Sequence, residues 1–320
     1  MSNIHSQLEK LKSDGVNLTT AELLRYQQLA KLMNLTPKKV PQARLSGSYL
    51  TKHKGRGMEF DEARHYQPGD DIRAIDWRVT ARTGKTHTKI YREERERPVF
   101  IFCDYLPSMG FGTKLLTKAV QAAHISSLIS WSAAARGDKV GALVFNQNSH
   151  KEVKPLSRKK AVLHVCHELI ALSQGAHGEQ PNTARDQDAF SDACARARRL
   201  AKPGSLVYLV SDFQNMSTSA QQHLTHLTRH CEVRAIVVDD PFEHKLPETD
   251  ALQSVNVSDG VVNQRWVLGD SKETLSYSEW REEQNTAITQ TLKQMSIARY
   301  HVSSAYPLDE QLQSMQRESV

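Results

Sequence analysis

Residues 98–112, PVFIFCDYLPSMGFG, decide the fold class of this chain. The run Val99–Cys103 is uniformly apolar, which is typical of a strand buried on both faces of a sheet. Asp104 ends the run, and Gly110 and Gly112 close the loop that follows. In open α/β sheets, ligands bind beyond the carboxyl ends of the strands. The stretch therefore predicts a parallel sheet with a site at the loop after Asp104.

Strand and helix patterns alternate from residue 98 onward. We expect, in chain order, strand 98–103, helix 114–135, strand 139–145, edge strand 150–154, helices 158–173 and 186–201, strand 205–212, helix 218–230, strand 232–238, a hairpin around 258–260, helix 277–295 and strand 298–303. Apolar strands that alternate with helices favour an α/β, Rossmann-like fold, in which a doubly wound, mostly parallel sheet has helices on both faces.

The chain divides by pattern into an N-terminal helical extension (1–45), a charged, partly β segment packed on the core (46–97) and an α/β domain (98–320). In the extension, Thr19 and Glu22 predict a capping box ahead of a helix over 21–34. The apolar stripe of this helix packs either on the body of the protein or on another chain, and packing within the chain is the simpler expectation.

The composition is typical of a folded protein. The 320 residues are 39% hydrophobic, which suffices for a core, and the formal net charge is +6. We find neither a signal-peptide pattern nor an uncharged apolar run of about 18 residues, so we predict a cytoplasmic protein that does not span a membrane. The four cysteines stand singly, which indicates reduced thiols rather than zinc or redox pairs.

The segment 46–97 is dense in charges of both signs. Mixed signs favour internal ion pairs or a protein contact, whereas a nucleic-acid footprint usually has one sign, so we expect no nucleic-acid partner. One constellation within it consists of Arg64, Asp70, Asp71, Arg73, Asp76, Trp77 and Arg78. It fits either an active site or a structural segment held together by ion pairs, which we call the buckle. The buckle is the favoured interpretation, and in it Asp70 and Asp71 accept backbone hydrogen bonds and pair with Arg73 or Arg78.

Three motifs carry a family resemblance: GRGMEFDEARHYQPGDDIRAIDWRVTAR (55–82), KIYREERE (89–96) and, after a strand, D-x-x-x-S-M-x-F-G (104–112). With them the chain resembles the bacterial domain of unknown function 58 family over residues 47–241. The resemblance implies a von Willebrand factor A-like fold. It also implies partnership with a MoxR-type AAA+ ATPase.

The resemblance further implies a metal-ion-dependent adhesion site, whose ligands are a D-x-S-x-S motif, a threonine and a later aspartate. Asp104 and Ser108 match the first motif, but Leu106 replaces its first serine, so the site is degenerate. Asp212 matches the later aspartate, and Thr183 is the nearest threonine. Because Mg²⁺ prefers six oxygen ligands, this set is expected to hold it weakly. Alternatively, Asp104 and Asp212 only cap strand and helix ends through backbone N–H groups.

Catalytic motifs are missing from the sequence. We find no nucleophile elbow, P-loop or dinucleotide-binding loop, so we predict neither an enzyme nor a nucleotide cofactor. The function predicted first is a chaperone-like, protein-binding adaptor that works with a MoxR-type AAA+ ATPase on an unknown client protein. The alternative is a metal-dependent hydrolase of phosphate esters that uses Asp104 and Asp212. A nucleic-acid-binding protein is the third possibility.

Overall fold

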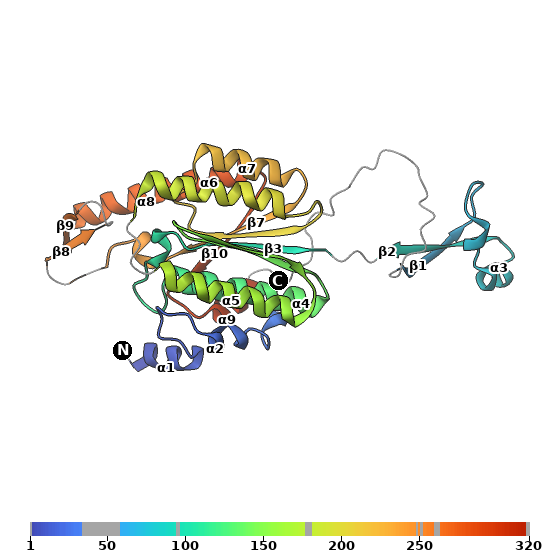
Figure 1. Cartoon of the computed structure of the whole chain (residues 1–320), viewed down its shortest axis with the longest axis horizontal. Coiled ribbons are helices and arrows are strands. Elements are labelled where there is room, and N and C mark those ends of the chain that lie inside the picture. The colour runs from blue at the N-terminus through green and yellow to red at the C-terminus, as the bar shows by residue number, and fades with distance from the viewer. Residues whose placement is uncertain are drawn as a thin grey trace. The chain divides into compact units, whose positions relative to one another are not determined.

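The computed structural model describes residues 2–33, 58–93, 97–176, 181–247, 249, 252–258 and 263–317. The chain forms two compact units (Figure 1). Unit 1 comprises residues 1–41 and 97–320, and unit 2 comprises residues 42–96. Each unit is described by itself. The prediction that segment 46–97 packs on the core therefore stays a prediction.

A six-stranded sheet forms the centre of unit 1, in the order β10-β7-β6-β3-β4-β5. Its strands are β3 (Val99–Asp104), β4 (Val140–Phe145), β5 (His150–Leu156), β6 (Leu206–Ser211), β7 (Glu232–Asp239) and β10 (Ala298–Ser303). All neighbours are parallel except β4 and β5, which are antiparallel. Every residue of β3, β4 and β6 is buried, as their apolar sequences predicted.

Helices cover both faces of this sheet, as Figure 1 shows. The helices are α1 (Ser2–Leu11), α2 (Thr20–Arg25), α4 (Lys118–Arg136), α5 (Arg158–Ala176), α6 (Thr183–Leu200), α7 (Thr218–Thr228), α8 (Ser271–Gln294) and α9 (Leu308–Arg317), with short 3-10 turns η1 (Ala30–Leu32), η3 (Pro107–Gly110) and η4 (Pro241–Glu243). One apolar core lies under α4 and α5, and a second lies under α6 and α7. The predicted mixed α/β fold with a mostly parallel, helix-flanked sheet is confirmed.

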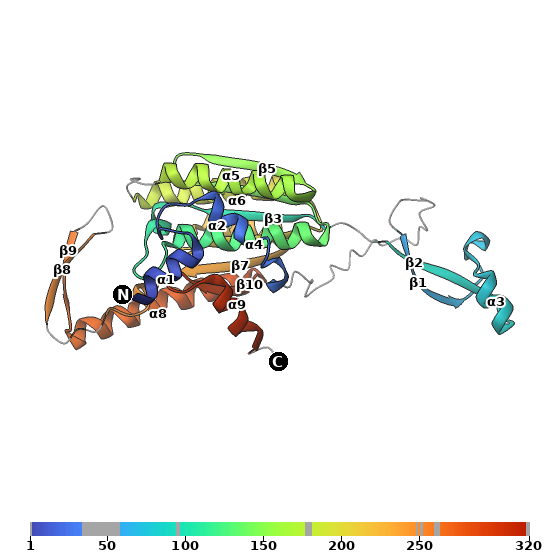
Figure 2. The same cartoon turned by 90° about the horizontal axis from the view of Figure 1, so that it is seen from below.

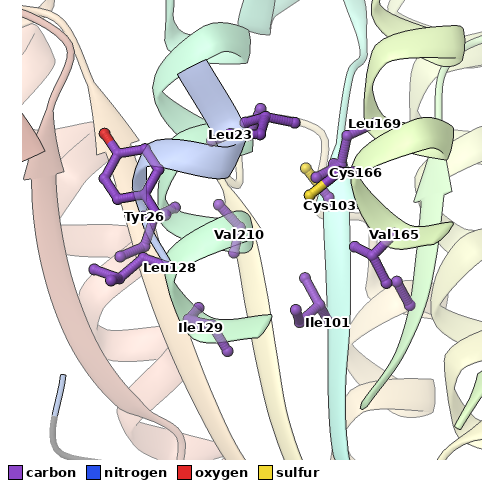
Figure 3. Packing of buried hydrophobic residues seen from close by; sticks show 14 of the residues in the cluster. Leu23, Tyr26, Ile101, Cys103, Leu128, Ile129, Val165, Cys166, Leu169 and Val210 are labelled. Atoms are coloured by element: carbon purple, nitrogen blue, oxygen red, sulfur yellow. The ribbon is translucent and has the colours of Figure 1, made fainter. Parts of the chain in front are cut away.

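The N-terminal extension packs on its own chain, against α4 and α5 (Figure 3). Leu23 of α2 and Tyr26, the C-cap of this helix, are 0% and 1% exposed, and the predicted capping box of Thr19 and Glu22 is present. The predicted single helix over 21–34 is wrong, because α2 ends at Arg25. The Leu23 carbonyl, which a longer helix would use, accepts hydrogen bonds from Ser127 and Trp131 of α4 instead.

Tertiary hydrogen bonds also delay the start of α4, which was predicted at residue 114. The N–H of Leu116 donates to the Ser304 carbonyl, and the N–H of Thr117 donates to the Gly15 carbonyl. Thr113 donates to Asp240 through its N–H and its hydroxyl. These groups are therefore bonded to distant segments, and α4 begins after the N-cap Thr117.

A two-stranded antiparallel sheet, β8 (Gln253–Ser258) and β9 (Asn263–Leu268), precedes α8 in unit 1 (Figure 2). Its strands agree with the predicted hairpin, whose turn lies partly outside the described residues. The N-cap Asp270 starts α8 six residues before the position predicted from the sequence. Helices α1 and α9 were not predicted.

Unit 2 contains the antiparallel strands β1 (Met58–His65) and β2 (His87–Glu93), the 3-10 turn η2 (Ile72–Ala74) and helix α3 (Trp77–Thr83). The β character of the tract around residue 90 is confirmed, whereas α3 was not predicted. Among the described residues of both units, no helix is both long and apolar enough to cross a membrane. The cytoplasmic location stays a prediction.

Candidate functional site at the carboxyl edge of the sheet

Three parallel strands deliver acidic residues to the same edge of the central sheet. Strand β3 ends at Asp104, β6 is followed directly by Asp212, and β7 ends at Asp239. Because β7, β6 and β3 are neighbours, their carboxyl ends lie together at what we call the carboxyl edge. The site that the sequence predicted after Asp104 therefore extends over three strand ends.

Asp104 is fully buried and both of its carboxylate oxygens are engaged. Oδ1 accepts a hydrogen bond from the Leu106 N–H at 2.8 Å, and Oδ2 accepts one from the Ser211 hydroxyl at 2.7 Å. Burial raises the pKa of Asp104 to about 7, and the negative charge of Asp212 adds to this effect, although the two hydrogen bonds and Lys118 oppose it. Near neutral pH the Asp104 carboxyl group is therefore protonated in some molecules and ionised in others.

A buried lysine stands at the centre of the site. Lys118, the first residue of α4, is 0% exposed, and its Nζ lies 2.8 Å from Asp212 Oδ2 and 2.7 Å from Glu243 Oε1. Burial alone would lower the pKa of Lys118, but the two carboxylates overcome this and raise it. The ammonium therefore stays charged and neutralises the acids around it.

Arg281 of α8 and Gln214 complete this charge network on the side of Glu243. The Arg281 guanidinium lies 3.1 Å from Glu243 Oε1, and its Nε donates to the Glu243 carbonyl at 2.6 Å. The side-chain amide of Gln214 donates to the same Oε1 at 2.7 Å. Two cations, Lys118 and Arg281, thus balance the two carboxylates Asp212 and Glu243, which makes the network neutral and rigid.

A cavity of about 350 Å³ opens beside this network. Asp212, Gln214 and Arg281 line it together with residues of α8. Trp280, which is 50% exposed, stands on its wall, and the Arg281 guanidinium lies over the Trp280 ring at 5.5 Å from the centroid. The carboxyl edge therefore presents a polar hollow with an aromatic wall.

The predicted adhesion-site residues are brought together only in part. Asp104 and Asp212 lie at the carboxyl edge, but Leu106 is a buried apolar side chain. Ser108 has a buried hydroxyl that lacks a hydrogen-bond partner among the described residues. Thr183 is an exposed residue at the start of α6.

This arrangement does not fit the Mg²⁺ ion that the family resemblance implied. Both oxygens of Asp104 accept hydrogen bonds from the protein, and the Lys118 ammonium holds the Asp212 oxygen that a metal would need. Mg²⁺ requires about six oxygen ligands at about 2.1 Å. The cation present at the site is therefore an amino acid side chain. Magnesium binding itself stays a prediction.

The charged constellation lies in unit 2, where its acids serve mainly as backbone caps. Asp70 pairs with Arg64 at 2.7 Å and accepts from the Gln67 N–H. The expected pairing with Arg73 or Arg78 is wrong for the described residues, because Asp71 accepts the Arg73 N–H instead.

Asp76 is the N-cap of α3 and accepts the N–H groups of Arg78 and Val79. Trp77, the aromatic member of the constellation, is 67% exposed within unit 2. The side chains of Arg73 and Arg78 also face solvent. The backbone hydrogen bonds that were expected for Asp70 and Asp71 are present. Among the described residues of unit 2, caps and the Arg64–Asp70 ion pair hold the buckle.

Sequence reasoning missed Lys118, Glu243 and Arg281. The one available signal was a lysine at the first position of a buried, Ala-rich helix, where a cation is unfavourable to the helix dipole. Such a placement indicates a specific partner, but the sequence does not identify it. Glu243 was hidden in the turn after Asp239 and Asp240, and Arg281 in a long polar helix.

Comparison with known proteins gives a family and distant structural likenesses. The model of the family described as protein of unknown function DUF58 matches residues 62–274, more than half of the chain. An uncharacterized protein of Mycobacterium tuberculosis and one of Mycobacterium bovis are each 28% identical over 234 residues, which are 73% of this chain and 71% of theirs.

Two crystal structures are similar at 16% identity. One is the conserved hypothetical protein BatB from Bacteroides thetaiotaomicron, with a TM-score of 0.42 over 70% of this chain and 97% of that one. The other is an aerotolerance-related membrane protein from Bacteroides fragilis, with a TM-score of 0.34 over 69% of this chain and 98% of that one. Both TM-scores are below 0.5, so these similarities assign neither a fold nor a function to this chain.

Proposed function

Because this chain belongs to the DUF58 family, whose function is unknown, we propose its role from its own site: it is a non-catalytic, protein-binding adaptor of von Willebrand factor A type. Its partner is a MoxR-type AAA+ ATPase, and together they assemble or mature a client protein. The observation that carries the proposal is the internally neutralised carboxyl edge, where the buried Lys118 ammonium is held between Asp212 and Glu243.

A fixed ammonium suits an interaction surface better than a reaction centre. The oxygens of Asp212 and Glu243 that face Lys118 accept hydrogen bonds from its ammonium, and burial prevents the ammonium from reaching a substrate. The network instead fixes the loops after β6 and β7, which form the wall of the cavity. A rigid, water-accessible hollow lowers the conformational cost of binding a protein segment.

Trp280 and Arg281 supply the residue types that dominate protein interfaces. Tryptophan and arginine are enriched among residues that contribute most to binding, particularly beside well-formed pockets. Trp280 is half exposed at the cavity, and Arg281 is held against it by Glu243. A partner side chain inserted into the cavity would pack on the indole ring and meet the polar groups of Gln214 and Asn285.

The experiment that identifies the partner is affinity capture with the full chain as bait in native lysate, with and without ATP. We expect an AAA+ ATPase to be enriched in quantitative mass spectrometry, together with a client protein. The control variant is Leu163→Ala. Leu163 is an exposed apolar residue of α5, which lies on the face of the sheet opposite α8, and we expect this variant to retain the ATPase. Absence of any AAA+ ATPase from the wild-type capture would refute the partnership.

The hydrolase alternative has less support at this site. It requires Asp104 and Asp212 as metal ligands, and in the structure these carboxylates are bonded to Leu106, Ser211 and Lys118. A nucleic-acid function has no additional observation in its favour. Both stay predictions from the sequence.

A further inference from the structure

Two histidines converge on one carboxylate oxygen at the outer side of the carboxyl edge. Asp239 is the last residue of β7, His244 follows the turn η4, and His301 lies on the neighbouring strand β10. His244 Nε2 lies 2.5 Å from Asp239 Oδ2, and His301 Nε2 contacts the same oxygen. One ligand atom from each residue lies within 4.8 Å of the others. Three side chains of types that commonly bind metals therefore come from separate segments and lie close together.

The second oxygen of Asp239 makes this cluster unusual. Oδ1 is buried and has no hydrogen-bond partner among the described residues. A buried acceptor without a partner is energetically costly, and more so when it is charged, so proteins rarely leave one. A cation bound at the carboxylate would satisfy it.

The surroundings hold the cluster in place. Tyr277 donates to the Phe242 carbonyl, and Arg281 donates to the Glu243 carbonyl, so α8 fixes the turn that carries His244. Asn285 lies with its side-chain amide 3.4 Å from His244 Nδ1. A carboxamide can turn over to present its oxygen, and metal-bound histidines commonly donate their second N–H to such a group.

We propose that Asp239, His244 and His301 form a binding site for a divalent transition-metal ion, with Zn²⁺ as the expected ion. Two imidazole nitrogens and one carboxylate are ligands that zinc accepts, whereas Mg²⁺ and Ca²⁺ require oxygen ligands. In a tetrahedral zinc site the ligand atoms lie about 3.3 Å apart. The imidazoles must therefore move outward slightly, and both rings are free to do so because they are 45% and 46% exposed.

Three protein ligands leave one coordination position for another group. Asp239 and His244 line the cavity of about 350 Å³, so a water molecule or a carboxylate has room at that position. The cluster shares no residue with the network of Asp104, Lys118 and Asp212. It also stands independently of the proposed adaptor role, because it rests on the geometry of its own three side chains.

The test is a titration of the chelator-treated full chain with ZnCl₂ by isothermal calorimetry at neutral pH. We expect one Zn²⁺ ion per chain, no competition by Mg²⁺, and a rise in melting temperature on binding. His244→Ala and His301→Ala lose this binding. Asp239→Asn, which keeps the shape of the side chain, weakens it strongly, and circular dichroism verifies that each variant is folded.

A matched control is His150→Ala. His150 lies 3.7 Å from Glu152 on β5, the other edge strand of the same sheet, and is also partly exposed. This variant retains full binding, whereas adventitious binding by surface histidines would fall equally in all histidine variants. Substitution with Co²⁺ gives the strong visible absorption of a tetrahedral site in the wild type and in His150→Ala, but not in His244→Ala or His301→Ala. The proposal is overturned if the wild type binds no stoichiometric Zn²⁺, or if His301→Ala binds it as well as the wild type.

Discussion

The Nζ of Lys118 lies 2.8 Å from Oδ2 of Asp212, and the two side chains are 0% and 3% exposed. A charge pair this deeply buried is expensive to break, because removing one partner leaves the other charge without compensation. Glu243 Oε1 also contacts the ammonium, at 2.7 Å, so the lysine serves both carboxylates. The pair therefore explains how Asp212 and Glu243 coexist in one buried region.

The first prediction concerns Lys118→Met, which keeps the length of the side chain and removes its charge. We expect the free energy of unfolding to fall by about 3–5 kcal/mol, because Asp212 loses its cation and Glu243 keeps only Arg281. Urea denaturation followed by circular dichroism measures the loss. In a double-mutant cycle, Asp212→Asn combined with Lys118→Met should cost less than the sum of the two single changes; simple additivity would contradict the pairing.

The second prediction concerns the pH dependence that Asp104 confers. Its pKa is raised to about 7 in the folded protein from 3.8, so the folded state binds the proton more tightly than the unfolded chain. This contribution to stability is fully present below about pH 4 and is lost as the pH rises through about 7. Asp104→Asn has no titrating group there.

The measurement compares the unfolding free energies of the wild type and Asp104→Asn across this pH range. The difference, variant minus wild type, should increase as the pH rises from about 4 to about 7. Titrating groups that do not interact with Asp104 are common to both proteins and cancel in the difference. A difference that is independent of pH, or that decreases, would show that the pKa of Asp104 is not raised.

The third prediction concerns the loop after Asp104. A methyl group at Gly112 would lie 2.7 Å from the α-carbon of Thr117 and against the Leu116 carbonyl, whereas one at Gly110 would meet nothing within 4 Å. Gly112→Ala should therefore destabilise the protein by about 1–3 kcal/mol through overpacking. Gly110→Ala, two residues away, should change stability by less than about 0.5 kcal/mol. Thermal melts of the two variants compare them directly, and equal melting temperatures would be inconsistent with the close approach at Gly112.

The fourth prediction separates two residues of the charged constellation in unit 2. Asp76→Ala removes the N-cap of α3 and should cost about 0.5–2 kcal/mol locally, whereas Arg73→Ala removes an exposed side chain and should be neutral. Hydrogen exchange of the α3 amides reports this local stability. If Arg73→Ala accelerated exchange as much as Asp76→Ala, an ion-paired buckle would describe the segment better than a capped one.

Local sequence signals predicted the central sheet well because they act over short distances. The apolar run ending at Asp104 and the strand ending at Asp212 were placed correctly, since burial on both faces demands continuous apolar residues. The helix over 21–34 was wrong because Ser127 and Trp131, about a hundred residues away, bind the Leu23 carbonyl. The helix propensity of residues 21–34 carries no information about such long-range contacts.

The candidate site was less predictable for the same reason. Lys118 meets Asp212 across 94 residues, and His301 meets Asp239 across 62, so no spacing rule connects them. The sequence located the edge of the sheet where the acids gather, because parallel strands end together. It did not identify the cation, because a lysine, an arginine and a metal ion all satisfy the same carboxylates.

The central claim, that the cavity at the carboxyl edge binds an AAA+ ATPase, is tested most directly by measuring the affinity of the purified ATPase for Trp280→Ala. Trp280 forms one wall of the cavity and is half exposed, so its truncation should leave the fold intact. We predict a Kd about thirtyfold higher than that of the wild type, or about 2 kcal/mol, with Leu163→Ala unchanged. Equal Kd values for wild type and Trp280→Ala would contradict the claim and place the interface elsewhere.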